Sequence, residues 1–396
     1  MGGKIHVRRV QDMDANGRTV LVRVDYNVPL EGRRIGDDAR IRTSLPTIRH
    51  LVDAGAKIVL ATHLGRPAGR RVDALRLDPV SERLSELLGR RVEKLPDCVG
   101  DEILSSIESG GAGDIFLLEN VRFHPEEEAN DPEFAAALAA PADVFVNDAF
   151  ATIHRGHAST YGVAEYLPSF AGLLVQRELE ALERLRDGPE RPYVAIVGGK
   201  KASSKLGPLR DLVSRVDGVL VGGGVAFTLL RAMGASVGDS RVEDDVLEEA
   251  AEIVRLAEDA GVELLLPKDA VVARELSDDA ETTVGDARSI PEGWAAFDIG
   301  PETVRAFAET IRRSRSLVWT GPMGAFEFEP FSQGTIGVAE AVAQSSAFSV
   351  IGGGETGEAI ARFGFAERVS YVSTGGGACL AVLRGKRLPA LTALLE

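Results

Sequence analysis

The chain alternates short runs of Val, Ile and Leu with longer amphipathic segments. Ten runs have the length and the β-branched content of buried strands, and they cover residues 20–24, 57–61, 115–119, 144–146, 193–197, 218–222, 262–266, 316–319, 348–351 and 368–372. The stretches between most of these runs are long enough for helices, and alternating strands and helices are typical of parallel sheets. We therefore predict an α/β fold with two doubly wound, Rossmann-like parallel sheets.

A single helical segment separates the first four runs from the last six. Val175, Leu179 and Leu182 have helical spacing there, and Gly188-Pro189 ends the helix. The length of 396 residues also favours two domains, because single cores stop growing near about 250–300 residues. We expect the domains and the linking helix at residues 1–170, 171–188 and 189–380, in the order domain, interdomain helix, domain.

The charge balance excludes several classes of partner. The chain has 45 Lys and Arg against 60 Asp and Glu, a net charge of −15, so neither nucleic acid nor an anionic membrane is an expected partner. No run of about 18 apolar residues predicts a membrane span. The two cysteines, Cys98 and Cys379, match neither a disulfide framework nor a metal-binding spacing, which favours a reduced, cytoplasmic protein.

Polar side chains gather where the strands of the first half are expected to end. In parallel sheets these ends share one edge, and ligands bind there. Arginine forks bind carboxylate and phosphate oxygens in pairs, so the edge suits a small, multiply charged anion. Each arginine alone is better explained by a surface ion pair, and Arg23 is left out because it is expected in mid-strand. The candidates are Asp25, Asn27, Arg40, His63, Arg66, Arg122 and Arg155.

The second half combines glycine-rich turns with a lysine cluster. Lys200, Lys201 and Lys205 lie within six positions in a chain that has only eight lysines. Triple glycines at 352–354 and 375–377 follow predicted strands and precede helical patterns. Glycine lets backbone N–H groups approach phosphate oxygens at a helix N-terminus. Tight turns made for packing are the alternative for each glycine run alone, but the combination favours phosphate binding.

Gly352, Gly354 and Gly357 also satisfy the dinucleotide pattern Gly-x-Gly-x-x-Gly. The acidic residue expected about 20 residues later is missing, which weakens a nicotinamide-dependent oxidoreductase as an alternative. A P-loop is excluded because the chain has no Gly-x-x-x-x-Gly-Lys-[Ser/Thr]. An anion pocket in one domain and a nucleotide-phosphate pocket in the other fit phosphoryl transfer, which needs positioning and cations rather than covalent chemistry.

Ordered segments along nearly the whole chain resemble the phosphoglycerate kinase family. They are RVDYNVP (23–29), DDARIRTSLPTI (37–48), THLGRP (62–67), ENVRFHPEE (119–127), NDAFATIHRGHAS (147–159), VGGKKASSKL (197–206), GGGVAFTLL (222–230), FDIGPET (297–303), WTGPMGAFE (319–327), IGGGETG (351–357) and STGGGACL (373–380).

The resemblance implies reversible transfer of the acyl phosphate of 1,3-bisphosphoglycerate to ADP with Mg²⁺, giving 3-phosphoglycerate and ATP. It also implies a monomeric, hinge-bending enzyme whose segment 381–396 packs back onto the first domain. The seven candidates of the first half would hold the phosphoglycerate. Arg40, Lys201 and the backbone at Gly376 would stabilise the transferring phosphoryl group. The nucleotide would be held by Lys201, Lys205, Glu327, Gly353, Gly354, Glu355 and Thr356, with Glu355 also nearest the metal.

Five positions depart from the family pattern. Glu355 stands where the family has Asp, and Thr320 where it has Asn. Lys200 replaces Ala and Ser204 replaces Asp beside the catalytic lysine, and Ala296 replaces a Gly near the expected adenine pocket. We expect an active enzyme with a shifted nucleotide or metal preference. A non-catalytic paralogue that kept the scaffold is the alternative.

Overall fold

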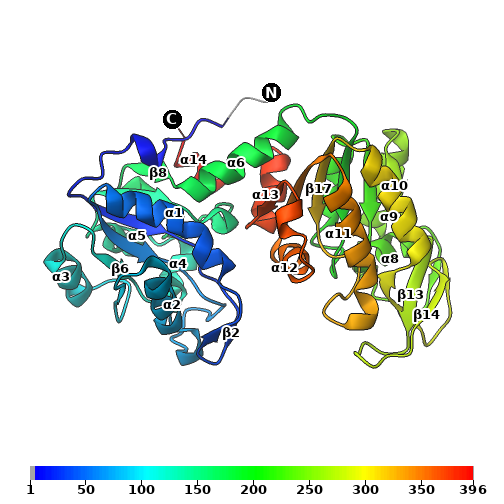
Figure 1. The fold of residues 1–396 in the computed structure, drawn as a ribbon, viewed down its shortest axis with the longest axis horizontal. Helices are drawn as coiled ribbons and strands as arrows, with labels where there is room; N and C mark the ends of the chain where they lie inside the picture. Colours follow the sequence, from blue (N-terminus) through cyan, green and yellow to red (C-terminus); the bar gives the residue numbers. More distant parts are fainter. Residues whose placement is uncertain (1–4, 396) are drawn as a thin grey trace. The chain divides into compact units, whose positions relative to one another are not determined.

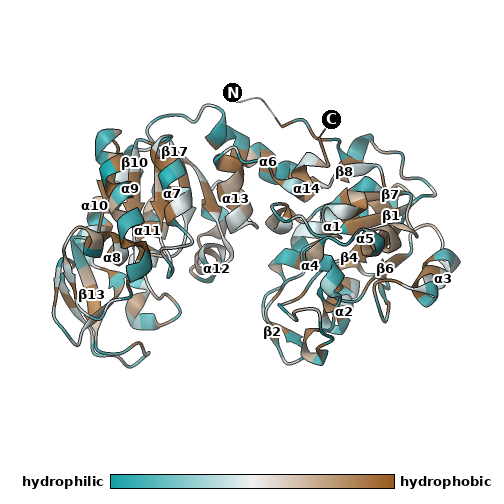
Figure 2. Cartoon of the chain, turned by 180° about the vertical axis from the view of Figure 1, so that it is seen from behind, coloured by the Kyte–Doolittle hydropathy of each residue, from teal (hydrophilic) through white to brown (hydrophobic). Residues whose placement is uncertain are grey.

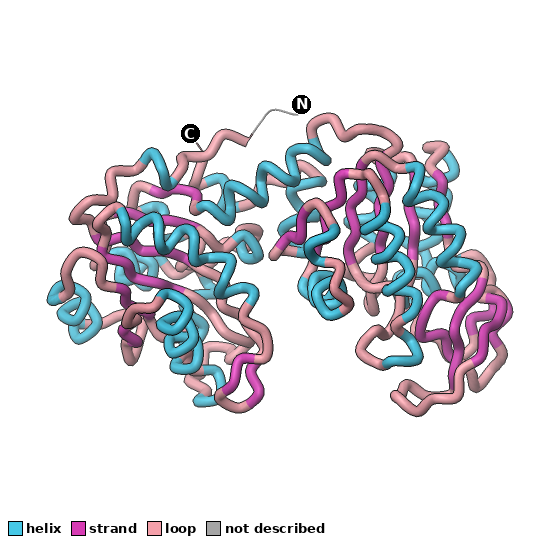
Figure 3. The backbone as a smooth tube through the Cα atoms, in the orientation of Figure 1, coloured by secondary structure: helices cyan, strands magenta, loops and turns pink. Residues whose placement is uncertain are grey.

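The computed structural model describes residues 5–395, and the chain divides into two compact units (Figure 1). The first unit comprises the described residues up to Glu180 together with those from Arg387 onward, and the second comprises Ala181–Lys386. Each unit has a parallel sheet with helices against it (Figure 3). Among the described residues, no helix combines the length and apolar character that a membrane span requires.

The first unit is built on a six-stranded parallel sheet. Arg23 pairs with Ala61 on one neighbouring strand and with Asn147 on the other, so the residues that follow these three positions meet at one edge. In spatial order the strands are β5 (Glu93–Lys94), β6 (Ile115–Leu117), β4 (Lys57–Ala61), β1 (Thr19–Arg23), β7 (Val144–Asn147) and β8 (Ser169–Ala171).

Alternation along β1 divides the core of the first unit between the two faces of its sheet. Val20 and Val22 pack with residues of α1 and α2, whereas Leu21 packs with residues of α3 and α5 on the other face. The strands are accordingly the most apolar part of the unit (Figure 2). The helices are α1 (Ala39–Asp53), α2 (Asp78–Leu88), α3 (Asp101–Ser109), α4 (Pro125–Ala129), α5 (Pro132–Ala139) and α14 (Pro389–Thr392), and a hairpin joins β2 (Leu30–Glu31) to β3 (Arg34–Ile35).

Asp148 connects the end of β7 to α6 (Leu173–Arg186), the helix that runs from the first unit into the second. The carboxylate is buried and accepts a hydrogen bond from the Leu174 amide at 2.9 Å. The hydroxyl of Thr47 accepts a hydrogen bond from the preceding amide, that of Leu173, at 3.0 Å. Two side chains from separate elements thus satisfy amides of the first turn of α6, which lack partners within the helix.

The second unit has its own six-stranded parallel sheet. In spatial order its strands are β12 (Glu263–Leu265), β10 (Gly218–Val221), β9 (Tyr193–Val197), β17 (Ser316–Thr320), β18 (Phe348–Gly352) and β19 (Tyr371–Ser373). Its helices are α7 (Leu206–Val213), α8 (Gly223–Ala232), α9 (Leu247–Asp259), α10 (Pro301–Arg313), α11 (Gln333–Gln344), α12 (Gly354–Arg362) and α13 (Gly376–Leu383).

The predicted fold class is confirmed, and the strands expected at residues 57–61 and 193–197 have the same bounds in the structure. Two details were wrong. Arg23 is the last residue of β1 rather than a mid-strand residue, and the strand expected to start at Arg368 starts at Tyr371 because Ala366–Arg368 form a 3-10 turn.

The prediction also missed the edge strands β5 and β8 of the first sheet, the β2–β3 hairpin and the small sheets of the second unit. An antiparallel sheet has the order β14 (Thr283–Asp286), β13 (Asp269–Ala273), β16 (Ala295–Ile299), and β11 (Ser236–Val237) pairs with β15 (Ser289–Ile290). β11 and β15 have two residues each and β14 is largely exposed, so their apolar signal is weak. β13 and β16 have five mostly buried residues each, and the prediction overlooked them.

Candidate active site

The ends of β1 and β4 bring an acid, an arginine and a histidine together. The Asp25 carboxylate forms an ion pair with Arg40, in the first turn of α1. His63 follows β4, and its Nδ1 lies 3.8 Å from Oδ1 of Asp25 and 3.2 Å from the Arg23 guanidinium. Since arginine only donates, Nδ1 is the acceptor and Nε2 carries the proton. Burial, then the charges of Arg23 and Arg122, hold the pKa of His63 well below its ordinary value, so the ring is a neutral donor.

Arg23, which the sequence analysis excluded, belongs to this group. Its side chain is almost completely buried, and Nε donates to the Ser159 hydroxyl at 2.8 Å. That hydroxyl donates to the buried Glu127 carboxylate at 2.6 Å. Burial lowers the pKa of Arg23, and the charge of Glu127 opposes this effect. A buried cation, compensated by the Glu127 carboxylate, therefore lies next to His63. The feature of the sequence that could have predicted this role is an arginine near the end of an apolar run.

The loop after β4 is held by two other predicted residues. Asn27 Oδ1 accepts a hydrogen bond from the Gly65 amide at 2.8 Å, and Arg122 donates to the Gly65 carbonyl at 2.8 Å. Arg122 is buried beside Glu128, at 3.1 Å. Burial lowers the pKa of Arg122, and the charge of the exposed Arg66 acts in the same direction. Arg66 and Arg122 are thus two cations on one loop cluster, one facing solvent and one buried.

Arg155 lies in the loop that follows β7 and is half-buried. The Thr160 hydroxyl donates to its carbonyl at 3.1 Å, which fixes the loop locally. His157, two residues later, has its pKa lowered to about 4 by burial and then by the charges of Arg122 and Arg23. Because these charges act on both histidines, the segment after β7 belongs to the same strongly cationic edge.

In the second unit, Lys205 is the best-anchored of the predicted cations. It precedes α7, and its Nζ donates to the Thr320 hydroxyl, at the end of β17, at 2.9 Å. Burial lowers the pKa of Lys205, and the nearby Glu355 carboxylate acts in the opposite direction. Thr356, in the first turn of α12, accepts a hydrogen bond from the Gly321 amide at 2.6 Å. The Lys205–Thr320 bond thus connects the segment after β9 to the end of β17, and the Gly321–Thr356 bond connects the end of β17 to the helix that follows β18.

Two glycines make this edge possible. Gly321 has φ +85°, and a Cβ there would lie 2.1 Å from the Gly198 carbonyl oxygen. A Cβ at Gly376 would lie 2.7 Å from the Cα of Gly353. Gly354 and Gly376 begin α12 and α13, so two helix N-termini begin beside each other after neighbouring strands. Free N–H groups at such termini attract phosphate oxygens.

Lys201 and Glu327 occupy exposed loops that flank this edge. Lys201 lies in the turn after β9, where its carbonyl accepts a hydrogen bond from the Ser204 hydroxyl at 2.9 Å. Glu243, 40 positions later, accepts a hydrogen bond from the Ser203 amide at 2.7 Å and so ties the turn to the segment that follows β11. Lys201 therefore has a fixed backbone and a side chain open to solvent.

Asp298 lies close to the chain on both sides of Glu327 and binds it on the C-terminal side. Its buried carboxylate accepts hydrogen bonds from the Ile299 amide at 2.9 Å and the Gly334 amide at 2.6 Å. A Cβ at Gly324 or at Gly334 would lie 2.2 Å from the same carboxylate oxygen. Burial raises the pKa of Asp298 to about 8.

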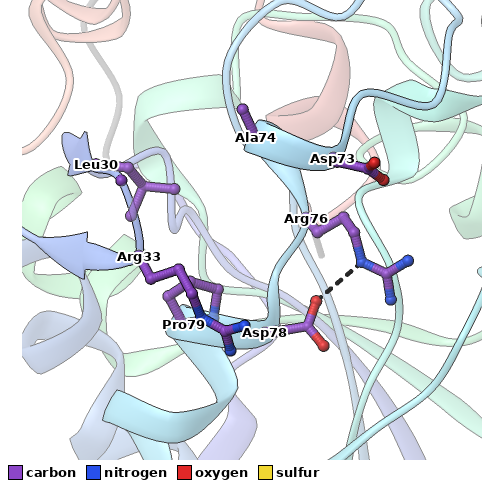
Figure 4. Close-up of a pocket in the computed structure, with 8 residues that line it drawn as sticks. Leu30, Arg33, Asp73, Ala74, Arg76, Asp78 and Pro79 are labelled. Carbon is purple, nitrogen blue, oxygen red and sulfur yellow. Dashed lines mark hydrogen bonds and ion pairs between the residues drawn. The ribbon is translucent and has the colours of Figure 1, made fainter.

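A hollow on the first unit, beside the β2–β3 hairpin, is lined by charges of both signs (Figure 4). Arg76 donates to Asp78 at 3.0 Å, and Arg33 pairs with Glu82 at 3.1 Å. Asp73 adds another negative charge to the lining. Because both arginines are already paired with carboxylates, the hollow does not favour an anion, and none of the predicted site residues lines it.

The first unit thus has a cationic sheet edge, and the second unit has a glycine-lined sheet edge. A family model for phosphoglycerate kinase matches residues 10–386. The chain belongs to the phosphoglycerate kinase family. Phosphoglycerate kinases of Moorella thermoacetica and Dictyoglomus turgidum are each 50% identical to it over 98% of both sequences. Two solved structures are also similar to this chain: the phosphoglycerate kinase of Coxiella burnetii, with 39% identity and a TM-score of 0.84, and that of Pyrococcus horikoshii, with 34% identity and a TM-score of 0.88. In each case the match covers 98% of this chain and 98% of the solved chain.

Family membership gives the departures from the pattern a structural meaning. Thr320, where the resemblance leads us to expect Asn, is the partner of Lys205, so a hydroxyl rather than an amide accepts from the ammonium group. Lys200 and Ser204 are exposed. Ala296 is buried in β16, where its amide donates to the Ser240 hydroxyl at 2.9 Å. None of these changes interrupts the arrangement of the sheet edge.

The only acidic residue predicted near the metal, Glu355, is exposed in the first turn of α12. Its charge acts on Lys205, so it belongs to the glycine-lined edge of the second unit. Mg²⁺ is commonly held by one or two carboxylates together with substrate phosphates and water. An exposed carboxylate in the first turn of α12 fits such an ion when it arrives with a nucleotide.

Proposed function

We propose that this chain catalyses reversible phosphoryl transfer from 1,3-bisphosphoglycerate to ADP, giving 3-phosphoglycerate and ATP, with Mg²⁺ bound through the nucleotide. The observation that carries the proposal is the family match over residues 10–386. The comparisons give no support to a dinucleotide-dependent oxidoreductase or to a non-catalytic paralogue.

The cationic edge of the first unit would bind the phosphoglycerate. Arg66, Arg122 and Arg155 supply the forks that match phosphate and carboxylate oxygens. The neutral His63 would donate from Nε2, because its Nδ1 already accepts from an arginine. Asn27, which faces solvent, offers an amide to the ligand. Asp25, paired with Arg40, would accept a hydroxyl proton of the substrate in a hydrogen bond.

The glycine-lined edge of the second unit would bind the nucleotide. Gly353, Gly354 and Thr356 offer the first turn of α12 to phosphate oxygens, and Lys205 neutralises charge beside them. Glu327 would accept from a ribose hydroxyl. Glu355 would hold the Mg²⁺, which neutralises the phosphate oxygens when it is bound.

In the transfer step, the bond between phosphorus and the acyl oxygen breaks while a bond to an oxygen of the ADP β-phosphate forms. The attacking phosphate oxygen is already ionised, and the acyl oxygen leaves as a carboxylate anion that needs no proton, so no general base or acid is needed. Arg40, Lys201 and the backbone N–H at Gly376 would stabilise the charge of the moving phosphoryl group. The neutral state of His63 and His157 is consistent with roles in binding rather than proton transfer.

The test is a coupled assay of ATP formation and consumption. Arg40→Ala and Lys201→Ala should lower kcat by about 10²–10³-fold, the usual effect of removing a group that stabilises transition-state charge. Arg49→Ala on the same helix as Arg40, and Lys268→Ala on the surface of the second unit, are matched controls that should retain activity. A wild-type chain inactive with ATP or GTP and with Mg²⁺ or Mn²⁺ would contradict the proposal and favour the non-catalytic paralogue.

We also propose a cytoplasmic monomer, supported by the acidic composition and the absence of a disulfide framework. Sedimentation velocity at micromolar concentration should give a single species near 42.1 kDa, and a dimer would contradict this part of the proposal.

A further inference from the structure

Asp97, Cys98 and His124 come together on the first unit although 26 positions separate His124 from Cys98. One oxygen, the sulfur and one ring nitrogen all lie within 4.8 Å of one another. Among residues 5–395, this is the one group of three such side chains with that spacing. The sequence spacing gave no sign of it, because the cysteine and the histidine lie on loops joined only by the fold.

We propose that Asp97, Cys98 and His124 bind a thiophilic divalent cation of the Zn²⁺ class. A thiolate, an imidazole and a carboxylate are a ligand set that Zn²⁺ accepts, with a fourth position left to water. Metal–ligand distances of about 2.0–2.3 Å place tetrahedral donors about 3.3–3.8 Å apart, so the three atoms need only small side-chain rotations.

The surroundings fix the positions of the donors. His124 Nε2 lies 2.6 Å from Asp97 Oδ1, so the cation would take the place of the proton between them. The imidazole stacks on Phe134, with ring centroids 4.9 Å apart, which fixes its plane. The Cys98 thiol points at the Glu119 carbonyl, at 3.0 Å, and would give up its proton to solvent on forming the metal–sulfur bond.

The group is open on one side. The side chains of Asp97 and His124 are 40% and 25% exposed, whereas Cys98 is buried, so an ion enters from solvent over the carboxylate and meets the sulfur last. The facing positive charge is Arg71, whose Nη1 lies 3.8 Å from the second oxygen of Asp97. The Arg71 side chain is 48% exposed and can turn away when the cation binds.

Cobalt is the probe, because a Co²⁺–thiolate bond gives a charge-transfer absorption that other ligands do not. The full-length chain, freed of metal with a chelator that is then removed, should bind one equivalent of Co²⁺ with this absorption, and Zn²⁺ should displace it. Cys98→Ser should abolish the thiolate band, and His124→Gln and Asp97→Asn should weaken binding by at least about tenfold. Cys379→Ser, at the other buried cysteine, should leave the titration unchanged.

A wild-type chain without a stoichiometric thiolate band would overturn the proposal. So would a band that persists in folded Cys98→Ser, that disappears in folded Cys379→Ser, or that keeps its affinity in His124→Gln. Circular dichroism of each variant establishes folding. His124→Gln, at a partly exposed position, decides the outcome if Cys98→Ser does not fold.

Discussion

Replacing Asp148 by Asn should stabilise the first unit, with a gain that grows between about pH 4 and pH 7 and is complete above pH 7. Burial raises the pKa of Asp148 to about 7, with hydrogen bonds from Thr47 and the Leu174 amide partly opposing the effect. Between about pH 4 and pH 7, the folded state therefore keeps a proton on Asp148 that the unfolded state has lost. The free energy of unfolding is then highest below pH 4, falls as the pH rises from about 4 to about 7, and does not fall further above pH 7.

The difference between about 7 and the ordinary value of 3.8 corresponds to a loss of about 4 kcal/mol above pH 7. Asparagine removes the charge, keeps an acceptor for the Leu174 amide, and can donate to the Thr47 hydroxyl. The positive end of the α6 dipole favours the carboxylate and reduces the gain. We expect Asp148→Asn to add about 2–4 kcal/mol to the free energy of unfolding at pH 8, and close to nothing at pH 4.

The assay is urea unfolding followed by far-UV circular dichroism between pH 4 and pH 8.5. Trp294 and Trp319, the two tryptophans of the chain, both lie in the second unit, so their fluorescence reports the unfolding of that unit alongside the circular dichroism signal. Asp143→Asn, at an exposed carboxylate before β7, is the matched control and should not stabilise the first unit. A gain that is equal at pH 5 and pH 8, or larger at pH 5, would refute the reasoning.

Two further variants test the second unit. Gly376→Ala puts a Cβ 2.7 Å from Gly353 Cα and should weaken ADP binding by at least about tenfold in calorimetric titration. Gly207→Ala, also in a helix but with nothing within 4 Å, should bind ADP normally; equal affinities would contradict the role of close backbone approach. Thr320→Val removes the partner of Lys205 and should raise the KM for nucleotide about 2–10-fold in the coupled assay. Thr320→Ser should restore the KM, and a valine variant with normal KM would show that the hydroxyl is dispensable.

The parallel strands were predictable because burial on both faces makes them continuous apolar runs. β4 and β9 are the clearest cases, since all or nearly all of their residues are buried. β14 was missed because three of its four residues are exposed, so its sequence has no apolar run. Its place in the fold depends on its pairing with β13.

The site residues were predicted by their position after strands, and contacts between distant segments decided the rest. Arg23 was predicted to be a mid-strand residue because apolar residues flank it in the sequence. Its charge is held at the sheet edge by Ser159 and Glu127, which are more than 100 positions away and could not be recognised as its partners. The same holds for His124, which no local pattern connects to Cys98. Local sequence shows which side chains follow a strand, whereas their partners depend on tertiary packing.

The crowding around Asp298 has a consequence for how this protein can diverge. One carboxylate oxygen occupies the space that a side chain at either Gly324 or Gly334 would need. A mutation at either glycine is therefore tolerated only in a background where position 298 has already become smaller, and that background has lost the acceptor of two amides. Single substitutions at these positions should therefore be destabilising, and we expect Asp298, Gly324 and Gly334 to be retained together in proteins that descend from this one.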